Sequence, residues 1–220
     1  MTPLNDIYPT IQGEGTYSGS PIVLLRLMGC SVGCPWCDTK ETWVGESVYL
    51  KENLQDALGK NAIWAEVDEK EIAGYCQDYF GHIENILITG GEPAENSLDN
   101  LVQAFHFFNK TVHVETSGTA SGVIGCGADW ITVSPKINMP GGKQVINEVI
   151  CIADEIKYPV GKQLDIDLLD TLLENHHCPP ETIYLQPLSQ SKKATELCVN
   201  TALERGWNIS PQIHKYLELP

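Results

Sequence analysis

Ile22-Val23-Leu24-Leu25-Arg26-Leu27 is a nearly continuous apolar run, of the kind that forms a strand covered on both faces. It leads into a loop rich in cysteine and glycine, Gly29-Cys30-Ser31-Val32-Gly33-Cys34-Pro35-Trp36-Cys37-Asp38. These two features predict a buried strand that presents a reactive loop at its end. Further short runs of the same character predict the other strands of a largely parallel sheet, at residues 86–89, 112–115, 130–133, 155–158 and 183–186.

Segments with apolar residues at helical spacing lie between these runs and predict helices over residues 98–108, 164–172 and 194–202, with a weaker pattern over 66–80. Ser97 is placed to cap the first helix and Gly206 to end the last. Strands that alternate with helices indicate parallel βα units. A complete eight-unit barrel takes about 250 residues. A chain of 220 residues with six predicted strands therefore favours an α/β fold with a shortened, open, partial (βα) barrel resembling part of a TIM barrel.

The composition is that of an acidic, globular chain. Hydrophobic residues make up 42% and charged residues 20%, and 14 Lys and Arg against 29 Asp and Glu give a formal net charge of −15. That charge argues against a nucleic-acid backbone or an anionic membrane surface as the main partner. No repeat or linker interrupts residues 1–220, so we expect a single domain. With no leader-like segment and no apolar run that could span a bilayer, we expect a cytoplasmic protein.

Three of the eight cysteines, Cys30, Cys34 and Cys37, form the pattern C-x3-C-x2-C. Three thiolates this close in sequence can wrap one small metal centre. Structural zinc usually needs four ligands, whereas an iron–sulfur cluster accepts thiolates, and a 4Fe-4S cluster with three cysteines keeps one iron open. A zinc site completed from a distant part of the chain is the alternative. The remaining cysteines are expected to be structural residues without crosslinks, at Cys76, Cys126, Cys151, Cys178 and Cys198.

Polar residues gather where the predicted strands end. Because the carboxyl ends of parallel strands meet at one edge, we expect these residues to face a shared site. Arg26 lies inside an apolar run, where an unpaired charge is costly, so it indicates a function. His113 lies mid-strand and is expected to be a core histidine with satisfied hydrogen bonds. The strand-end residues are Thr89, Glu92, Glu115, Thr116, Ser117, Ser134, Lys136 and Gln186.

The cysteine triplet, with Trp36 before its last member, and the later run Gly90-Gly91-Glu92-Pro93 resemble the radical S-adenosylmethionine (SAM) superfamily. The resemblance implies that the three cysteines are catalytic ligands of a 4Fe-4S cluster. It also implies that the glycine-rich turn receives the amino group of SAM, since carbonyls and a carboxylate accept hydrogen bonds from an ammonium. The residues that it assigns to SAM are Gly91, Glu92, Ser117, Ser134, Pro135, Lys136 and Gln186.

Further motifs, spread over nearly the whole chain, resemble the 7-carboxy-7-deazaguanine synthase family. That resemblance implies ring contraction of 6-carboxy-5,6,7,8-tetrahydropterin to 7-carboxy-7-deazaguanine with loss of ammonia, in 7-deazapurine (queuosine) biosynthesis. It also implies catalytic use of SAM, a requirement for Mg²⁺, and a homodimer on a shortened barrel. The motifs are Ile11–Gly15, Arg26, Cys34–Thr39, Glu115–Thr119, Val133–Lys136 and His214–Tyr216.

The same resemblance suggests how this chain would bind the carboxylated pterin. A carboxylate such as Glu14 can accept from the N–H groups of an amino-pyrimidinone edge, and the guanidinium of Arg26 suits the substrate carboxylate. Thr39 is the residue expected at Mg²⁺, which prefers oxygen ligands. The residues expected at the substrate are Ile11, Gln12, Gly13, Glu14, Arg26, Thr89, His214 and Pro220.

Two other functions compete with this interpretation. A radical-activating SAM enzyme, which makes a glycyl radical on a partner protein, shares the cysteine triplet and the Gly-Gly-Glu-Pro turn. It does not call for the Gln12–Glu14 element or for Pro220. A non-catalytic zinc-binding module is the second alternative. If the synthase interpretation holds, the resemblance implies an electron donor such as a flavodoxin.

Overall fold

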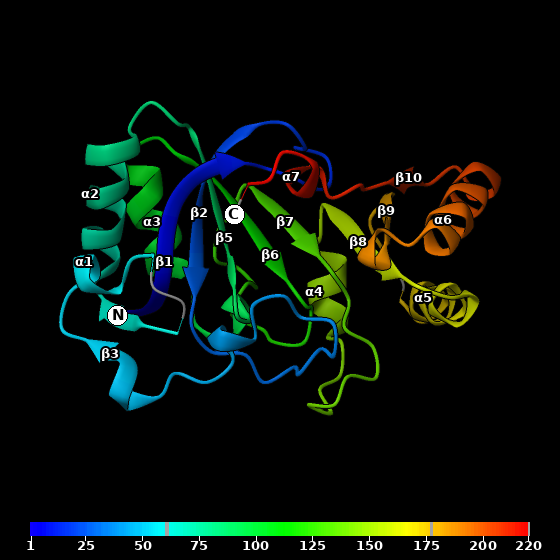
Figure 1. The fold of residues 1–220 in the computed structure, drawn as a ribbon, viewed down its shortest axis with the longest axis horizontal. Helices are drawn as coiled ribbons and strands as arrows, with labels where there is room; N and C mark the ends of the chain where they lie inside the picture. The colour runs from blue at the N-terminus through cyan, green and yellow to red at the C-terminus, as the bar shows by residue number, and fades with distance from the viewer. Residues whose placement is uncertain (60–61, 177, 220) are drawn as a thin grey trace.

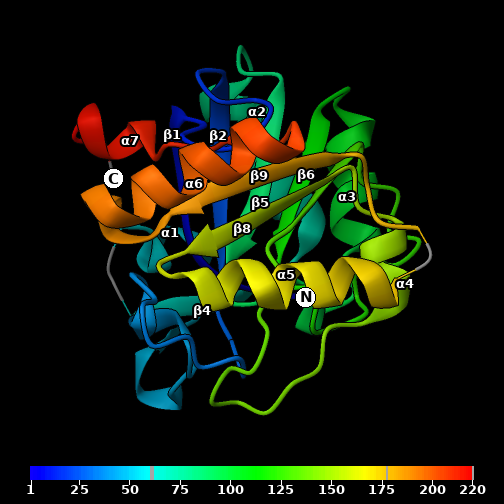
Figure 2. The same cartoon turned by 90° about the vertical axis from the view of Figure 1, so that its right-hand side faces the viewer.

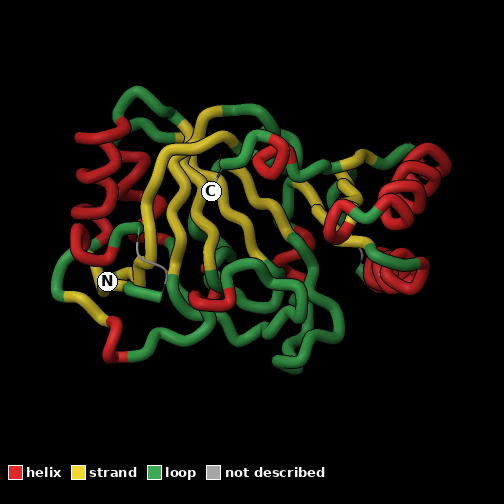
Figure 3. The backbone as a smooth tube through the Cα atoms, viewed as in Figure 1, coloured by secondary structure: helices red, strands yellow, loops and turns green. Residues whose placement is uncertain are grey.

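A computed structural model describes residues 1–59, 62–176 and 178–219. Within them the chain forms a ten-stranded sheet in the order β10-β9-β8-β7-β6-β5-β2-β1-β4-β3 (Figures 1 and 3). All six predicted strands are present and pair in parallel with one another. They are β2 (Pro21–Leu27), β5 (Asn85–Gly90), β6 (Thr111–Thr116), β7 (Trp130–Val133), β8 (Glu155–Val160) and β9 (Thr182–Pro187). The linear order, with unjoined ends, is that of the predicted open, partial barrel.

The sheet also contains four strands that the sequence does not predict. β1 (Thr2–Ile11) pairs antiparallel with β2, and β4 (Trp64–Val67) pairs antiparallel with β1. Short strands extend the two edges, β3 (Leu50–Lys51) beside β4 and β10 (Asn208–Ile209) beside β9. β1 escapes a search for apolar runs because it contains polar residues and prolines and its register shifts between Leu4 and Asp6.

The long helices confirm the predicted pattern. In Figure 1, α2 (Glu69–Phe80) and α3 (Asp99–Phe107) lie at one end of the sheet, and α5 (Gln163–Asn175) and α6 (Lys192–Arg205) lie at the other. α5 and α6 run alongside β8 and β9 (Figure 2). The shorter helices are α1 (Leu54–Ala57), α4 (Asn147–Cys151) and α7 (Ile213–Tyr216), with single 3₁₀ turns η1 (Lys40–Thr42), η2 (Ser47–Tyr49), η3 (Pro93–Glu95) and η4 (Leu188–Gln190).

Two predicted helix ends differ in outcome. Gly206 ends α6 in the left-handed conformation, with a φ of 72°, as predicted. The prediction that Ser97 caps α3 is wrong. Leu98 occupies the capping position without a side-chain bond, and the Ser97 hydroxyl donates to the Asp99 carboxylate instead. The pattern over 66–80 is also divided, because its first residues belong to β4.

Alternation along the strands separates the core from the functional face. In β2 and β5 the buried residues Leu25 and Ile86 pack in the core, while Arg26 and Leu87 point to a cavity on the opposite face. β8 repeats the arrangement, because Ile156 belongs to the core and its neighbour Lys157 lines a cavity. Successive side chains of a strand point to opposite faces, so one set of strands builds both the core and the site.

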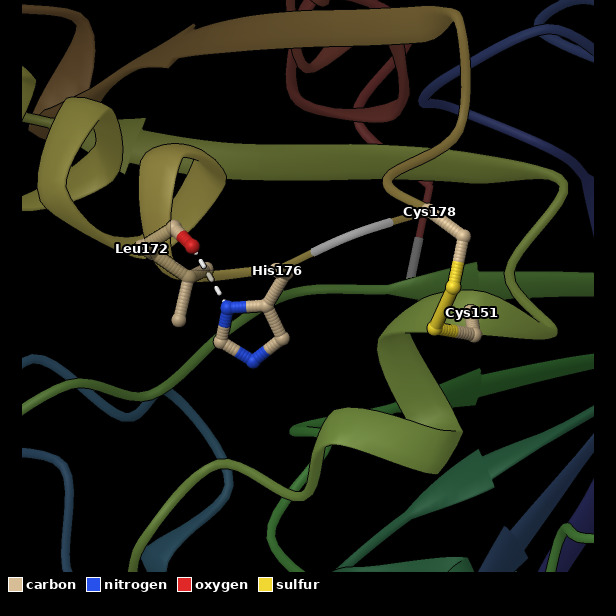
Figure 4. Close-up of a disulfide and its surroundings, with 4 residues drawn as sticks. All are labelled: Cys151, Leu172, His176 and Cys178. Atoms are coloured by element: carbon tan, nitrogen blue, oxygen red, sulfur yellow. Dashed lines mark hydrogen bonds between the residues drawn. A yellow bond between two sulfur atoms is a disulfide. The ribbon is translucent and has the colours of Figure 1, made fainter.

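The structure corrects the prediction that the five scattered cysteines are free of crosslinks. Cys151, the last residue of α4, forms a disulfide with Cys178, which precedes β9 (Figure 4). The two cysteines are 27 positions apart in the sequence, and α5 and both flanking strands must be placed before the two sulfurs meet. His176 ends α5, with its ring nitrogen bonded to the Leu172 carbonyl oxygen (Figure 4). His177, the next residue, lies outside the described residues.

The prediction for His113 is half correct. Its side chain is buried on β6 with an edge-on contact to the ring of Tyr17, but Nε2 has no hydrogen-bond partner among the described residues. Its pKa is lowered because burial disfavours the charged imidazolium. In the part of the chain that the structure describes, no helix is long and apolar enough to cross a membrane.

Candidate active site

The cysteine loop begins where β2 ends. Left-handed backbone at Gly29, with a φ of 102°, and at Gly33, with a φ of 72°, lets the loop fold back on itself. Cys30, Cys34 and Cys37 thereby line one cavity of about 290 Å³ at the carboxyl ends of the parallel strands. Burial raises the pKa of the Cys30 thiol to about 11.

Trp43 forms hydrogen bonds with both the first and the last cysteine of this loop. The backbone N–H of Cys30 donates to the Trp43 carbonyl oxygen over 3.0 Å. The indole Nε1–H of Trp43 donates to Cys37 Sγ over 3.3 Å, and the Thr39 hydroxyl lies 3.7 Å from the same sulfur. The sequence does not single out Trp43, because nothing in its local pattern shows that its ring turns back to a cysteine.

The donor set fits an iron–sulfur cluster better than a zinc ion. The three thiols line one cavity together with strand-end polar groups, glycines and the rings of Trp36 and Trp43. Structural zinc usually has four protein ligands, whereas three thiolates suit an iron–sulfur cluster that keeps one iron open.

The Gly90-Gly91-Glu92-Pro93 turn packs directly on the cysteine loop. Gly90 is left-handed, with a φ of 119°, and a Cβ on Gly91 would lie 2.0 Å from the Gly29 carbonyl oxygen. The Glu92 carboxylate is buried beneath the turn, where Oε1 accepts from the Thr116 hydroxyl and Oε2 from the Ser117 backbone N–H. This carboxylate braces the turn against β6, which leaves the glycine backbone as the surface of the turn that faces the cavity.

The other residues expected at SAM lie around the same cavity. Lys136 Nζ donates to the Ser134 carbonyl oxygen over 2.9 Å and to its hydroxyl over 2.5 Å. Burial lowers the pKa of Lys136, although the nearby Cys34 opposes that shift. Pro135, between them in the chain, is not among the described residues that line the cavity. The lining also includes Gly91, Glu92, Ser117 and Gln186.

A second cavity, of about 430 Å³, adjoins the first. Seven of the eight residues expected at the substrate line it, and the eighth, Pro220, lies outside the described residues. The seven are Ile11, Gln12, Gly13, Glu14, Arg26, Thr89 and His214. Both cavities are lined by Glu14, Asp38, Thr39, Thr89, Glu115 and Lys215.

Arg26 stands at the wall of the second cavity. Its guanidinium donates to the Tyr8 hydroxyl over 2.5 Å and lies 5.6 Å from the centre of that ring. One edge of the fork is therefore held by β1. This contact with Tyr8 fixes the orientation of the Arg26 guanidinium. The charge of that group would be costly to leave unpaired inside an apolar strand.

A buried lysine joins two carboxylates between the cavities. Lys157 Nζ lies 2.5 Å from Glu14 Oε2 and 2.8 Å from Glu115 Oε2, and the lysine side chain is only 4% exposed. The other oxygen of Glu14 accepts from Gln212 over 2.8 Å and from Gln186 over 3.2 Å. Lys157 and Gln212 are functional candidates that the sequence reasoning missed. Lys157 had a usable signal, because it interrupts an apolar strand as Arg26 does.

The network sets the charge of its members. Burial alone would raise the pKa of Glu14, but the charge and hydrogen bond of Lys157 lower it to about 2. Burial would lower the pKa of Lys157, but Glu115 and Glu14 together raise it above its usual range. Two carboxylates and one ammonium leave one negative charge facing the cavity, which suits a ligand edge rich in N–H donors.

The Gly13-Glu14-Gly15 loop is held in place by the late segment 210–214. The Ile213 N–H donates to the Gly13 carbonyl oxygen over 3.0 Å, and the Gly15 N–H donates to the Ser210 hydroxyl over 2.9 Å. A Cβ on Gly13 would lie 2.1 Å from His214 Nδ1. Only a residue without a side chain permits this approach, which brings Glu14 and His214 to the same cavity.

Comparison with known proteins defines first the class and then the family. Residues 11–130 match the family described as a 4Fe-4S single cluster domain, so the class is that of a protein with one such cluster domain. The chain is 39% identical over 223 residues to the 7-carboxy-7-deazaguanine synthase of Escherichia coli strain K12, covering 99% of this chain and 98% of the relative. It is 38% identical over 221 residues to that of Buchnera aphidicola subsp. Schizaphis graminum, with coverage of 99% and 98%. The chain belongs to the 7-carboxy-7-deazaguanine synthase family.

Solved structures agree with this relationship. The crystal structure of QueE from Escherichia coli superposes with a TM-score of 0.87 at 37% identity, covering 96% of this chain and 93% of that chain. The crystal structure of Streptococcus suis SuiB superposes with a TM-score of 0.53 at 13% identity, covering 86% of this chain and 48% of that one. The second similarity shows the fold alone.

Proposed function

We propose that this chain contracts 6-carboxy-5,6,7,8-tetrahydropterin to 7-carboxy-7-deazaguanine, with loss of ammonia, by radical SAM chemistry in 7-deazapurine biosynthesis. The observation that carries the proposal is the pair of adjoining cavities. One is lined by the three cysteines and the glycine turn, and the other by Glu14 and Arg26. Family membership over nearly the whole chain supports the same reaction.

Cys30, Cys34 and Cys37 would hold the 4Fe-4S cluster, and the Gly90-Gly91 backbone would receive the amino group of SAM. When bound, the cluster and SAM would supply the radical chemistry that the reaction needs at C6 of the pterin. Lys136 and Ser134, joined to each other, would fix one side of the SAM cavity. The role of the chain is to hold the reacting carbon beside the bound SAM and to exclude water.

Glu14 would accept N–H groups of the amino-pyrimidinone edge, because Lys157 keeps its carboxylate ionised. Gln12, whose amide donates to Glu115 over 3.1 Å, would supply a neighbouring donor and acceptor. Arg26, at the wall of the same cavity, would pair with the substrate carboxylate. Thr39 lines both cavities, so Mg²⁺ held there would meet substrate oxygens and neutralise developing charge.

The remaining features of the proposal rest on resemblance and composition. We place the enzyme in the cytoplasm as a single domain over residues 1–220, acting as a homodimer that receives electrons from a flavodoxin-like donor. The formal net charge of −15 supports a small-molecule substrate rather than a nucleic acid. Within this acidic chain, Arg26, Lys136 and His214 would be the local positive groups for an anionic substrate.

The test is anaerobic turnover of the reconstituted protein with SAM, Mg²⁺, a reductant and the carboxypterin. We expect 7-carboxy-7-deazaguanine and ammonia in equal amounts. The Cys37→Ala variant should form neither, whereas Cys126→Ala, which removes a thiol on another part of the fold, should retain turnover. Absence of product from a wild-type protein with full cluster content would refute the proposal.

A radical activase is the rival enzyme, and the named relatives do not favour it. An experiment without the small substrate distinguishes the activase from the synthase. An activase would consume SAM on a partner protein and leave a glycyl radical detectable by electron paramagnetic resonance (EPR). A synthase should give neither result, with or without the carboxypterin, because it would use SAM catalytically and needs no partner protein as substrate.

A further inference from the structure

Trp43 makes a hydrogen bond to a cysteine sulfur that the proposed reaction does not require. Its indole N–H points at Cys37 Sγ over 3.3 Å, within the range expected when sulfur is the acceptor. The Cys30 sulfur differs, because it receives backbone N–H groups of Val32 and Gly33. Trp43 therefore supplies a side-chain donor to the cysteine cluster, and a side-chain donor can be removed by substitution.

The position of the indole is fixed from several directions. Trp43 follows η1, where the Thr42 hydroxyl donates to the Thr39 carbonyl oxygen over 2.8 Å. The Gly29 N–H donates to the Thr42 carbonyl oxygen over 2.8 Å, which joins this turn to the end of β2. Lys40 Nζ lies 5.7 Å from the centre of the Trp43 ring. The backbone that carries Trp43 is thus anchored to the cysteine loop, and the indole lies between Lys40 and the Cys37 sulfur.

We propose that Trp43 is a positioning residue that raises the reduction potential of the cluster held by Cys37. A hydrogen bond to a ligating thiolate stabilises negative charge on sulfur, and the reduced cluster carries one more negative charge than the oxidised cluster. The donor therefore favours the reduced state. This inference rests on the proposed function in one respect, that Cys37 is a cluster ligand.

The electrostatics of the cavity make such a donor useful. Glu92 and Glu95 lie near Cys30, where their charges oppose formation of the thiolate. Lys136 lies on the other side, near Cys34. At Cys37 the indole N–H of Trp43 donates to the sulfur over 3.3 Å, and the Thr39 hydroxyl lies farther away, at 3.7 Å.

The test is a redox titration of Trp43→Phe, which keeps an aromatic ring but lacks the N–H. The reconstituted protein is titrated anaerobically without SAM or pterin, and the reduced cluster is measured by EPR. We expect the ratio of reduced to oxidised cluster at a fixed potential to fall about tenfold, a shift of about 59 mV for one electron. An unchanged potential at equal iron content would overturn the proposal.

Trp64→Phe is the matched control. Trp64 also donates its indole N–H, but to the Glu46 carbonyl oxygen over 3.1 Å, and its ring packs beside Gly45 in the same region. Its substitution removes an indole hydrogen bond that does not reach a thiolate, so the potential should stay at the wild-type value. An equal shift in both variants would assign the effect to disturbance of the loop and contradict the proposal.

A second measurement compares the wild type with Trp43→Phe by pulsed EPR. Protein labelled with ¹⁵N at the indole nitrogen of tryptophan should show a coupling to the spin of the reduced cluster that is lost in Trp43→Phe, whereas the label on Trp36, which lines the same cavity, is present in both proteins. Lack of that coupling would overturn the role of Trp43. Failure of the wild-type protein to hold iron would refute both this inference and the proposed function, whereas a cluster without pterin turnover would refute the function alone.

Discussion

Lys157 holds together two carboxylates that would otherwise repel each other. Its ammonium contacts Glu14 and Glu115 where all three side chains are mostly buried, at 4%, 15% and 19% exposure. Removal of one partner from a buried ion pair leaves an uncompensated charge, which typically costs about 3 to 5 kcal/mol. The lysine thus contributes to folding as well as to the charge of the pterin site.

We expect Lys157→Met to weaken substrate binding in a pH-dependent way. In the wild type the pKa of Glu14 is about 2, so its carboxylate stays ionised across neutral pH. Without Lys157 one proton binds to the carboxylate pair, with a pKa raised toward neutrality, and Glu14 loses part of its capacity to accept. KM should rise at least about tenfold at pH 7, a loss of about 1.4 kcal/mol, and should recover as the pH rises and this proton leaves.

Steady-state kinetics between pH 6 and 9 measure this effect. The surrounding charged groups that face the pair are Lys136 and His214, and neither is altered in the variant. Lys192→Met, at a side chain that is 92% exposed, is the control and should keep the wild-type profile. A KM increase of equal size at every pH would show that Lys157 acts only by packing.

The residues of the site differ in how far the sequence could reveal them. The cysteine triplet and Gly90–Pro93 can be recognised in the sequence from their spacing. Arg26 can be recognised because it is a charged residue in an apolar run. Lys157 carries the same signal as Arg26. Trp43 and Gln212 carry none, because each acts through a contact with a group distant in the fold or turned back along the loop.

At the scale of elements, the backbone of the glycine turn packs closely against the backbone of the cysteine loop. The Gly91 N–H donates to the Leu27 carbonyl oxygen over 2.8 Å, and the Glu92 N–H donates to that of Gly29 over 2.7 Å. These bonds extend the pairing of β5 with β2 beyond the last strand residues. The cysteine loop and the glycine turn, which are proposed to hold the cluster and SAM, are therefore joined in one corner of the fold.

Gly91→Ala should disrupt this corner. A Cβ would lie 2.0 Å from the Gly29 carbonyl oxygen, so the two loops must separate. We expect lower iron content after reconstitution and at least about tenfold weaker SAM binding, a loss of about 1.4 kcal/mol. Iron analysis and equilibrium binding measure both quantities.

Gly74→Ala is the matched control for that substitution. Gly74 lies within α2, has no positive φ, and a Cβ there would meet no atom within 4 Å. The change should leave iron content and SAM binding intact and raise the free energy of unfolding by about 0.5 to 1 kcal/mol. Loss of iron in both variants would contradict the special role of Gly91.

Elements were predictable where burial is continuous. Each of the six parallel strands contains buried apolar residues within a short β-branched or aliphatic run, so these runs stand out. β1 does not, because Asn5 and Asp6 interrupt it and it pairs at the margin of the barrel. The prediction that Ser97 caps α3 failed for a local reason, because its hydroxyl donates to the nearby Asp99 carboxylate.

At the scale of the molecule, the Cys151–Cys178 disulfide links α4 to the entry of β9. A crosslink that closes a loop of this length restricts the unfolded chain, which in the chain-entropy account stabilises the fold by about 3 kcal/mol. We expect the protein without its cluster to unfold at lower urea concentration after treatment with dithiothreitol.

The Cys151→Ala/Cys178→Ala variant provides the control for that experiment. It should have the lower stability of the reduced wild type and should not respond to dithiothreitol, although it retains the free thiols of Cys76, Cys126 and Cys198. Identical urea curves for oxidised and reduced wild type would contradict the prediction. The crosslink could not be read from the sequence, because a cysteine pair 27 residues apart has no local pattern.

The contacts between the Gly13–Gly15 loop and the segment 210–214 have a consequence for biosynthesis. This loop is among the earliest parts of the chain to be translated, and bonds from Ser210, Gln212 and Ile213 add to those that Lys157 and Gln186 make with Glu14. A nascent chain on the ribosome can therefore place Lys157 and Gln186 and still lack the last contacts of the loop. The loop gains its full set of bonds only after residue 213 has left the exit tunnel, so this side of the proposed pterin cavity is completed among the last steps of folding.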